Sequence, residues 1–395
     1  MRPTPRQALA ACLLAASVLT GRPAAAQQPV RIGVILPYSG QFADTGAQLD
    51  GGIKLYMKQA GDTVAGRKVE IIRRDVGGAA PDVAKRLAQE LVIRDKVDIL
   101  AGFVLTPNAL AAAEVSAEAE KLMVIMNAGT SIITTRSPYA TRTAVTAPQA
   151  AETLAAWAWR NGVRRVYTMV SDYGPGIDSE QMFLRAFREA GGESSGSVRF
   201  PIANPDFAVF AQRARDAAPE AIFLFMPAGS QPAAFARAMN DVGLSPRRTR
   251  VLGTGDLTSE NALKVLGDLA LGIITAWNYD WQQDTRLNAA FVRDYREMHG
   301  RNPDFMSVGG YDGMHLIYQA LRKTGGDAAG KALIAAARGL AWESPRGPIA
   351  IDPDTRDVIQ TIYIRRVDKV DGEVRNVTLD KVEGVKDPVL ARMKK

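Results

Sequence analysis

The segment SDYGPG at residues 171–176 joins an apolar run at 166–170 to a helix-like stretch that begins near Ile177. A strand, a glycine-rich turn and a helix can cradle a phosphate, because the N–H groups at a helix start favour an anion. The dinucleotide pattern is incomplete here, however: Ser179 stands where G-x-G-x-x-G needs its third glycine, and no acidic residue follows the next expected strand. The turn therefore predicts a ligand other than a dinucleotide.

Residues that carry enzyme chemistry are scarce. The two histidines, His299 and His315, both fall in helical patterns, and we interpret them as structural. No G-x-x-x-x-G-K-[ST] motif is present, and no cluster of histidines and carboxylates has metal-ligand spacing. These patterns predict a binding protein that uses no catalysis, no metal and no other cofactor.

Small and hydroxyl-bearing residues recur where apolar runs end. Glycine and alanine let a ligand approach the backbone, and serine or threonine hydroxyls add donors of adjustable direction. Any one of these segments could be an ordinary tight turn, but six of them predict a small polar or anionic ligand. They are Ser39-Gly40, Thr106-Pro107-Asn108, Ala128-Gly129-Thr130, Gly174-Pro175-Gly176, Ala228-Gly229-Ser230 and Thr254-Gly255.

Aromatic residues also lie near these expected strand ends. Tyr173 is the most informative, because an aromatic side chain at a strand end can cover the apolar part of a ligand. For Phe42, Tyr279 and Trp281, ligand contact and packing in the core or hinge both remain open. We interpret Trp277 as a packing residue.

The elements that must position these residues follow from the apolar pattern. Runs of four to eight apolar residues alternate with helix-period segments, which predicts an α/β fold with parallel sheets and crossover helices. In such sheets a ligand binds beyond the carboxyl ends of the strands, here in a cleft between two sheets. The expected strands are 30–36, 69–74, 97–101 and 122–126, then 165–170, 197–200, 221–225 and 250–253, then 347–351 and 358–367 before a basic tail.

The first 26 residues are typical of a secretory signal. Arg2 and Arg6 precede an apolar stretch at 8–19, and three alanines form a small-residue cleavage site before Gln27. Cys12, the one cysteine, is interpreted as part of this signal, with lipidation as the alternative. We therefore expect an exported, periplasmic protein that is soluble and free of disulfides.

Charge argues against a nucleic-acid partner. The formal net charge of +7 falls by three, to +4, when the arginines of the signal are removed. The remaining basic residues are spread along the chain with acids between them, which predicts a solvated surface.

Taken in order, these pieces resemble the periplasmic solute-binding proteins of the leucine/isoleucine/valine-binding type, which serve ABC importers. The resemblance covers about residues 30–370. It implies two Rossmann-like lobes with parallel sheets, joined by a hinge of three crossovers and closing on a ligand. It rests on IGVILPYSGQFADTGAQLDGGIKL, GFVLTPNALAAAEVSAEAEKLMVIMNAGT, SDYGPG, AFARAMNDVGL and SPRGPIAID.

The resemblance also implies boundaries and partners. We expect residues 27–145 and 281–343 to form the first lobe, and residues 146–280 and 344–395 to form the second. The implied partners are a small carboxylate or amino acid and, transiently, an ABC transporter membrane permease. A monomer suits a protein that presents two lobes to such a permease.

Binding residues can be carried over by position. In the family the first lobe holds the carboxylate of the ligand. Thr106 matches the hydroxyl-bearing position of the first binding loop, and Ala128, Gly129 and Thr130 match the second loop. We expect these four residues to hold a carboxylate through hydroxyl and backbone donors.

The apolar part of the ligand should meet other side chains. Tyr173 matches an aromatic that lies against the ligand, and Phe42 and Tyr279 are expected to line the same region. Ala228 matches a position where amino-acid binders often carry another aromatic, so this wall is expected to be more open.

One departure bears on the ligand. Amino-acid binders carry an acid for the ligand's ammonium where this chain has Gly255, and Asp256 follows one residue later. If Asp256 points into the cleft, an amino acid is expected; if not, a buried ammonium would be unpaired, and an aromatic or keto acid fits better. Relatives that bind aromatic carboxylates share the Asn-Ala-Gly turn seen at 127–129. A sensor of amides or amino acids and an exported cleft enzyme remain alternatives.

Overall fold

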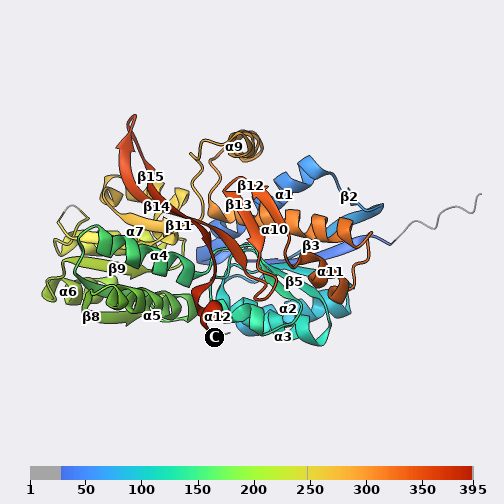
Figure 1. Ribbon diagram of the computed structural model, residues 1–395, viewed down its shortest axis with the longest axis horizontal. Coiled ribbons are helices and arrows are strands. Elements are labelled where there is room, and N and C mark those ends of the chain that lie inside the picture. The colour runs from blue at the N-terminus through green and yellow to red at the C-terminus, as the bar shows by residue number, and fades with distance from the viewer. Residues whose placement is uncertain (1–27, 247, 394–395) are drawn as a thin grey trace, which may run out of the picture.

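The structure, a computed structural model, describes residues 28–246 and 248–393. Two α/β lobes lie side by side: the first combines the blue to cyan elements with orange helices, and the second combines the green to yellow elements with red C-terminal strands (Figure 1). The predicted signal peptide, including Cys12, lies outside the described residues. Within the described ranges, none of the helices combines the length and apolarity that a bilayer crossing needs.

The first lobe is built on a six-stranded sheet. All neighbouring strands are parallel except the short pair β2 and β3, so helices must connect them and cover both faces. The strands in spatial order are β2 (Thr63–Val64), β3 (Arg67–Asp75), β1 (Val30–Leu36), β4 (Ile99–Gly102), β5 (Leu122–Ile125) and β6 (Ala140–Arg142). The helices are α1 (Ala43–Ala60), α2 (Pro81–Ile93), α3 (Thr106–Glu118), α9 (Arg286–His299), α10 (Phe305–Lys323) and α11 (Gly330–Ala337), with the 3-10 turns η1 (Gly40–Phe42) and η2 (Ser131–Thr135).

The second lobe carries a nine-stranded sheet, parallel at its centre and antiparallel where the C-terminal strands join it. The strands are β8 (Glu193–Phe200), β7 (Arg165–Ser171), β9 (Ala221–Phe225), β10 (Arg250–Thr254), β11 (Ile274–Trp277), β14 (Val358–Val370), β13 (Gly347–Ile351) and β12 (Ala341–Ser344), with β15 (Glu373–Val385) beside β14. The helices are α4 (Ala147–Arg160), α5 (Gly174–Glu189), α6 (Phe207–Asp216), α7 (Gln231–Asp241), α8 (Glu260–Leu266) and α12 (Pro388–Met393), with η3 (Gly255–Thr258) and η4 (Gly267–Ala270).

The chain crosses between the lobes three times, between β6 and α4, between β11 and α9, and between α11 and β12. The fold class predicted from the sequence, two Rossmann-like lobes on a three-crossover hinge, is therefore confirmed. The carboxyl ends of β4 and β5 in one lobe and of β7, β9 and β10 in the other face the same cleft. The residue boundaries expected for the lobes stay a prediction.

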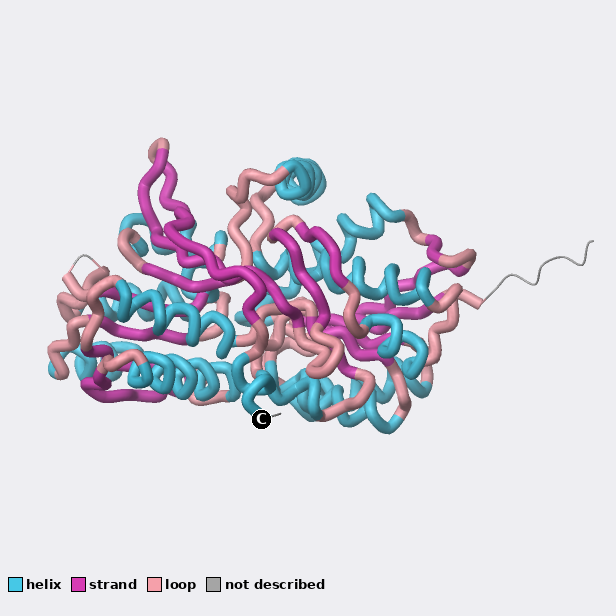
Figure 2. The backbone as a smooth tube through the Cα atoms, in the orientation of Figure 1, coloured by secondary structure: helices cyan, strands magenta, loops and turns pink. Residues whose placement is uncertain are grey.

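The expected strands are present, because central parallel strands are buried on both faces and read as continuous apolar runs. The expected basic tail after residue 367 is wrong. β14 and β15 form a long hairpin that projects from the second lobe (Figure 2). Its turn is Asp371-Gly372, both at positive φ (52° and 84°), a dipeptide that favours a two-residue hairpin. β15 is charged and mostly exposed, so it lacks the apolar run that marked the other strands.

Candidate functional site

A small cavity of about 30 Å³ lies where the two lobes meet. The first lobe contributes hydroxyl, amide and backbone groups to its wall, and the second lobe contributes aromatic rings and one carboxylate. The volume suffices for one or two waters, so an organic ligand requires the lobes to separate and close again around it.

The wall from the first lobe is suited to an anion. Thr106 is the first residue of α3, and its N-cap residue Leu105 provides no side-chain hydrogen bond to the helix. The N-terminus of α3 therefore faces the cavity without a capping side chain, where its partial positive charge favours a carboxylate. The Thr106 hydroxyl donates to the Thr130 hydroxyl at 3.1 Å, and Gly129 also lines the cavity.

A buried arginine holds the loop that carries Gly129. Arg142 Nη1 donates to the carbonyl oxygen of Ala128 at 2.8 Å, and Nη2 donates to that of Ser131 at 3.2 Å. Arg142 Nε forms an ion pair with Asp357 Oδ1 at 2.6 Å, and both side chains are buried. Since Ala128 N–H also donates to the Phe103 carbonyl at 2.9 Å, both backbone groups of Ala128 have structural partners.

The wall from the second lobe is aromatic. Tyr173 is the N-cap residue of α5, and its ring centroid lies 6.0 Å from that of Phe225 at the end of β9. Burial, followed by the charge of Asp256, raises the pKa of Tyr173 well above its ordinary value, so its hydroxyl stays protonated. Trp277, the last residue of β11, completes this side and packs edge-on against Phe305 at 5.2 Å.

Asp256 lines the cavity from η3. Its Oδ2 accepts a hydrogen bond from the Thr254 hydroxyl at 3.0 Å, and the backbone N–H of Ala228 also donates to its carboxylate. Burial raises the pKa of Asp256 to about 7 despite these donors and the more distant Arg365. Asp256 thus lines the cavity, while its carboxylate is already hydrogen-bonded to donors of its own lobe.

The structure brings together only some of the residues predicted from the sequence. Thr106, Gly129, Tyr173, Ala228 and Asp256 line the inter-lobe cavity. Thr130 does not line the cavity but accepts the hydrogen bond of Thr106, and both backbone groups of Ala128 are used inside the first lobe.

Phe42 and Tyr279 lie elsewhere. Phe42 is buried in the core, and a Cβ built on Gly229 would lie 3.5 Å from its ring. Tyr279 is fully buried beside Phe291, and its hydroxyl donates to Asn288 Oδ1 at 2.9 Å. Neither lines the inter-lobe cavity, so a ligand role for them stays a prediction from the sequence.

Other lining residues escaped the sequence-based selection, among them Phe225, Met306 and Trp277. Phe225 belongs to an apolar strand, where it reads as core, and Met306 lies in an apolar helix pattern. Trp277 was interpreted as a packing residue. Its position at a strand end could have marked Trp277 as a ligand-contact residue. That it lies beside the cavity depends on how the two lobes pack, which the sequence pattern does not show.

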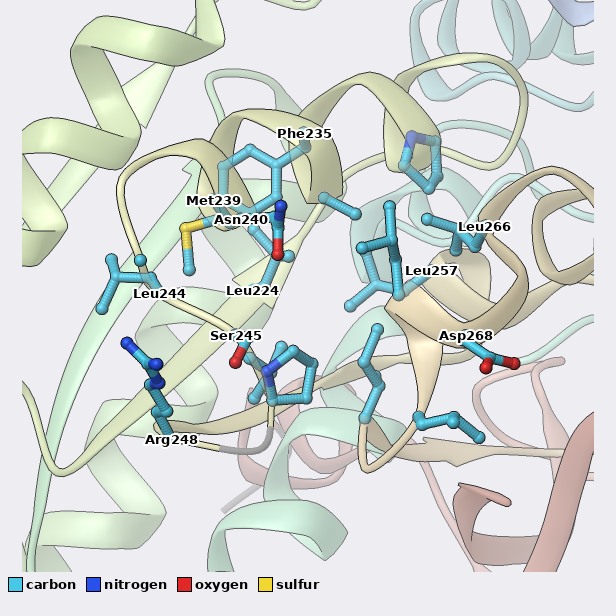
Figure 3. A pocket seen from close by; sticks show the side chains of 18 residues that line it. Leu224, Phe235, Met239, Asn240, Leu244, Ser245, Arg248, Leu257, Leu266 and Asp268 are labelled. Atoms are coloured by element: carbon cyan, nitrogen blue, oxygen red, sulfur yellow. The ribbon is translucent and has the colours of Figure 1, made fainter. Parts of the chain in front are cut away.

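A larger cavity of about 610 Å³ lies within the second lobe, between α7 and the α8–η4 segment. Figure 3 shows Phe235, Met239 and Leu257 around it, with Arg248 and Asp268 on opposite sides. Only one lobe lines it, and none of the predicted binding residues does. We place the ligand site in the smaller inter-lobe cavity, because hydroxyl, carboxylate and aromatic groups converge there from both lobes.

Metal chemistry finds no support in the described part of the chain. Nowhere within it do three or more histidine, cysteine, aspartate or glutamate side chains gather in a way that could hold a metal ion.

Direct contacts connect the lobes beside the cavity. Asp178 Oδ2 on α5 accepts the backbone N–H of Ser131 at 3.3 Å. Farther along the interface, Asn302 Nδ2 donates to Glu260 Oε2 on α8 at 3.5 Å. Burial, followed by the charges of Asp280 and Asp304, raises the pKa of Glu260 to about 7. Glu260 therefore keeps its proton to a higher pH than an ordinary glutamate, at a point where the two lobes are in contact.

We expect a pH effect on stability from Glu260. Its folded-state pKa lies above the ordinary 4.5, so the stabilisation is complete below pH 4.5 and is lost as pH rises through 7. Between pH 6.5 and 8 this group should remove about 1 kcal/mol from the free energy of unfolding. Urea titrations should show a shallower pH slope for Glu260→Gln. The exposed Glu297→Gln is the control, and an unchanged slope in Glu260→Gln would contradict the assignment.

The chain matches the family model of periplasmic binding proteins over residues 29–373. It is 42% identical to Leu/Ile/Val-binding protein homolog 6 of Brucella melitensis over 387 residues, which are 97% of each chain. A solute-binding protein of an ABC transporter from Rhodopseudomonas palustris BisB5, solved with 3,4-dihydroxybenzoic acid, is 49% identical. The TM-score is 0.88, and the match covers 92% of this chain and 99% of that one.

A second solute-binding protein of an ABC transporter, from Rhodopseudomonas palustris HaA2, was solved with p-hydroxybenzoic acid. It is 38% identical, with a TM-score of 0.89, and the match covers 92% of this chain and 100% of the other.

Proposed function

The chain belongs to the periplasmic binding protein family, and on this basis we propose that it captures a small aromatic carboxylate between its lobes for an ABC importer. One observation carries the choice of ligand. The uncapped N-terminus of α3 with the Thr106 hydroxyl faces an aromatic wall of Tyr173, Phe225 and Trp277 across a single cavity. An anion site opposite an apolar slot matches a ring that bears a carboxylate.

The carboxylate of the ligand would lie on the first lobe. Thr106 and Gly129 line the cavity there, and Thr130 supports the Thr106 hydroxyl. A hydroxyl donor and a helix N-terminus together offset the cost of taking a carboxylate out of water.

The aromatic ring of the ligand would lie against the second lobe. Tyr173 and Phe225 are already neighbours, and an inserted ring can make offset or edge-on contacts with them. Because the ring touches one lobe and the carboxylate the other, the ligand stabilises the closed arrangement over the open one. That difference is what a permease can recognise.

The wider assignment follows the family. The protein would act in the periplasm after export by its N-terminal signal, as a monomer that transiently contacts a membrane permease. It would release its ligand unchanged: the described residues that line the cavity include no cysteine, histidine or lysine to act as a nucleophile or as its base.

A second candidate ligand is a branched-chain amino acid. The observation in its favour is Asp256, a carboxylate on the cavity wall that could pair with an ammonium. The similar Rhodopseudomonas proteins solved with hydroxylated benzoic acids favour the aromatic ligand.

Thermal unfolding in the presence of ligands tests the proposal. The protein purified from the periplasm, unfolded and refolded to remove any bound solute, would be heated with benzoate, 4-hydroxybenzoate, leucine or isoleucine. A ligand at about one hundred times its dissociation constant adds about 2.7 kcal/mol to stability. We expect a rise in Tm with an aromatic acid and none with an amino acid. A rise with leucine or isoleucine alone would establish the second candidate, and no rise with any of the four would overturn both.

We expect Thr106→Ala to weaken binding of the aromatic acid by about 1–3 kcal/mol, or about 5- to 150-fold in dissociation constant. The reason is that the ligand carboxylate loses a donor in a buried setting while the α3 backbone remains. Calorimetric titration measures the loss. Thr135→Ala, an exposed threonine of the same lobe, is the control, and equal affinity in the two variants would remove Thr106 from the site.

A further inference from the structure

Gly255 and Trp277 fit together at the end of the cavity formed by the second lobe. β10 and β11 are adjacent parallel strands with Thr254 opposite Ala276, so the residues that follow them emerge side by side. A Cβ built on Gly255 would lie 2.2 Å from Trp277 Cγ. Any side chain at position 255 would therefore displace the indole. Gly255, which departs from the acid of amino-acid binders, makes room for Trp277.

The indole of Trp277 has an unused hydrogen-bond donor. The side chain is 4% exposed, and its Nε1 has no hydrogen-bond partner in residues 28–246 and 248–393. Buried polar atoms nearly always have a partner, so an orphaned N–H on a cavity-lining residue indicates where an acceptor atom of a ligand belongs.

A second polar residue lines the same cavity. Asp256 follows Gly255 directly, and Asp256 and Trp277 both belong to the wall formed by the second lobe. The carboxylate already accepts from the Thr254 hydroxyl and the Ala228 N–H, but each carboxylate oxygen can accept more than one hydrogen bond. The second lobe thus offers the ligand an N–H donor and a carboxylate acceptor from two adjacent strand ends.

A hydroxyl is the ligand group that satisfies both partners at once. It donates one hydrogen bond and accepts others, whereas an ammonium only donates and would leave Trp277 Nε1 unpaired. An unsubstituted ring edge satisfies neither partner. The combination of Asp256 with Trp277 therefore distinguishes a hydroxylated ring from both a plain ring and an amino acid.

We propose that Asp256 and Trp277 form a hydroxyl-recognition site, so that the preferred ligands are aromatic carboxylates with a ring hydroxyl remote from the carboxylate. The proposal rests on the function proposed above, because the carboxylate must lie on Thr106 in the first lobe. The hydroxyl then engages the second lobe, and a rigid ring connects the two. A hydroxyl at the 3- or 4-position can reach across, whereas one at the 2-position stays beside the carboxylate.

The test compares dissociation constants from calorimetric titration of benzoate and its 2-, 3- and 4-hydroxy derivatives. A site built to bond a hydroxyl discriminates against the analogue that lacks it, and we expect at least about tenfold tighter binding of the 3- or the 4-isomer. The 2-isomer should bind like benzoate.

Trp277→Phe replaces the indole with a smaller aromatic ring that has no N–H donor. It should lower the ratio of hydroxylated to plain affinity by about fivefold or more, because a plain ring has no acceptor for this N–H. Trp157→Phe, a half-buried tryptophan of α4, is the matched control. Asp256→Asn, which replaces the acid with an amide, should lower the same ratio and provides a second test if Trp277→Phe folds poorly.

The outcomes separate the two levels of the proposal. Binding of benzoate as tightly as its 3- and 4-hydroxy derivatives would overturn hydroxyl recognition and leave the aromatic carboxylate function standing. An unchanged ratio in a folded Trp277→Phe or in Asp256→Asn would also overturn it. Failure of all four acids to bind would instead reject the proposed function.

Discussion

Gly174→Ala should weaken ligand binding by about 5- to 150-fold without unfolding either lobe. Gly174 begins α5 in the second lobe and faces the first lobe across the cleft. A Cβ built on it would lie 2.5 Å from Thr130 Oγ1 and 3.1 Å from Thr106 Cγ2. The new methyl group would therefore meet Thr106 and Thr130, the pair that the proposed function places nearest the carboxylate of the ligand.

The strain would be confined to the closed arrangement. Both contacted side chains belong to the first lobe, so the second lobe can carry the methyl group when the lobes are apart. The φ angle of Gly174 is not positive, so alanine fits its backbone conformation. Overpacking of this kind typically costs about 1–3 kcal/mol. The ligand must supply that energy when the lobes close, and the cost appears as lost affinity.

Calorimetric titration and thermal unfolding should be measured together. We expect reduced affinity in Gly174→Ala and a ligand-free Tm close to that of the wild type. Gly78→Ala is the control, because a Cβ built there has no neighbour within 4 Å and the φ angle is not positive. Wild-type affinity in Gly174→Ala would show that the lobes do not approach this closely when ligand is bound.

Arg142→Met should lower the free energy of unfolding by about 3–5 kcal/mol, because it leaves a buried carboxylate without its cation. Arg142 and Asp357 have 0% and 1% side-chain exposure, and Asp357 lies at the entry to β14. The variant also frees the carbonyls of Ala128 and Ser131, so the loop bearing Gly129 loses its anchor. Ligand binding should fall with stability.

Urea unfolding of a double-mutant cycle would isolate the ion pair. Arg142→Met combined with Asp357→Leu removes both charges, and part of the lost stability should return. Arg136→Met, an exposed arginine of the same lobe, is the control. A loss below about 1 kcal/mol in Arg142→Met would mean that water reaches Asp357 and that the pair is not buried in solution.

Local pattern was sufficient for most of the fold. Central parallel strands are buried on both faces, so β1, β7 and β9 appear in the sequence as apolar runs, and the turns between them as glycine, proline and hydroxyl residues. β15 escaped because an exposed edge strand needs no apolar run; backbone pairing and the Asp371-Gly372 turn hold it in place.

The residues of the candidate site also fall into those that the sequence pattern identified and those that only the packing of the lobes revealed. By itself the sequence determined that Thr106, Gly129, Tyr173 and Asp256 stand at strand ends, and the fold carries such ends to one cleft. Only the tertiary structure decided that Tyr279 packs against Phe291 and bonds to Asn288, while Trp277 lines the cavity and lacks a partner for its N–H. The physical reason is that burial and hydrogen-bond saturation depend on elements distant in sequence, such as Gly255 making room for the indole.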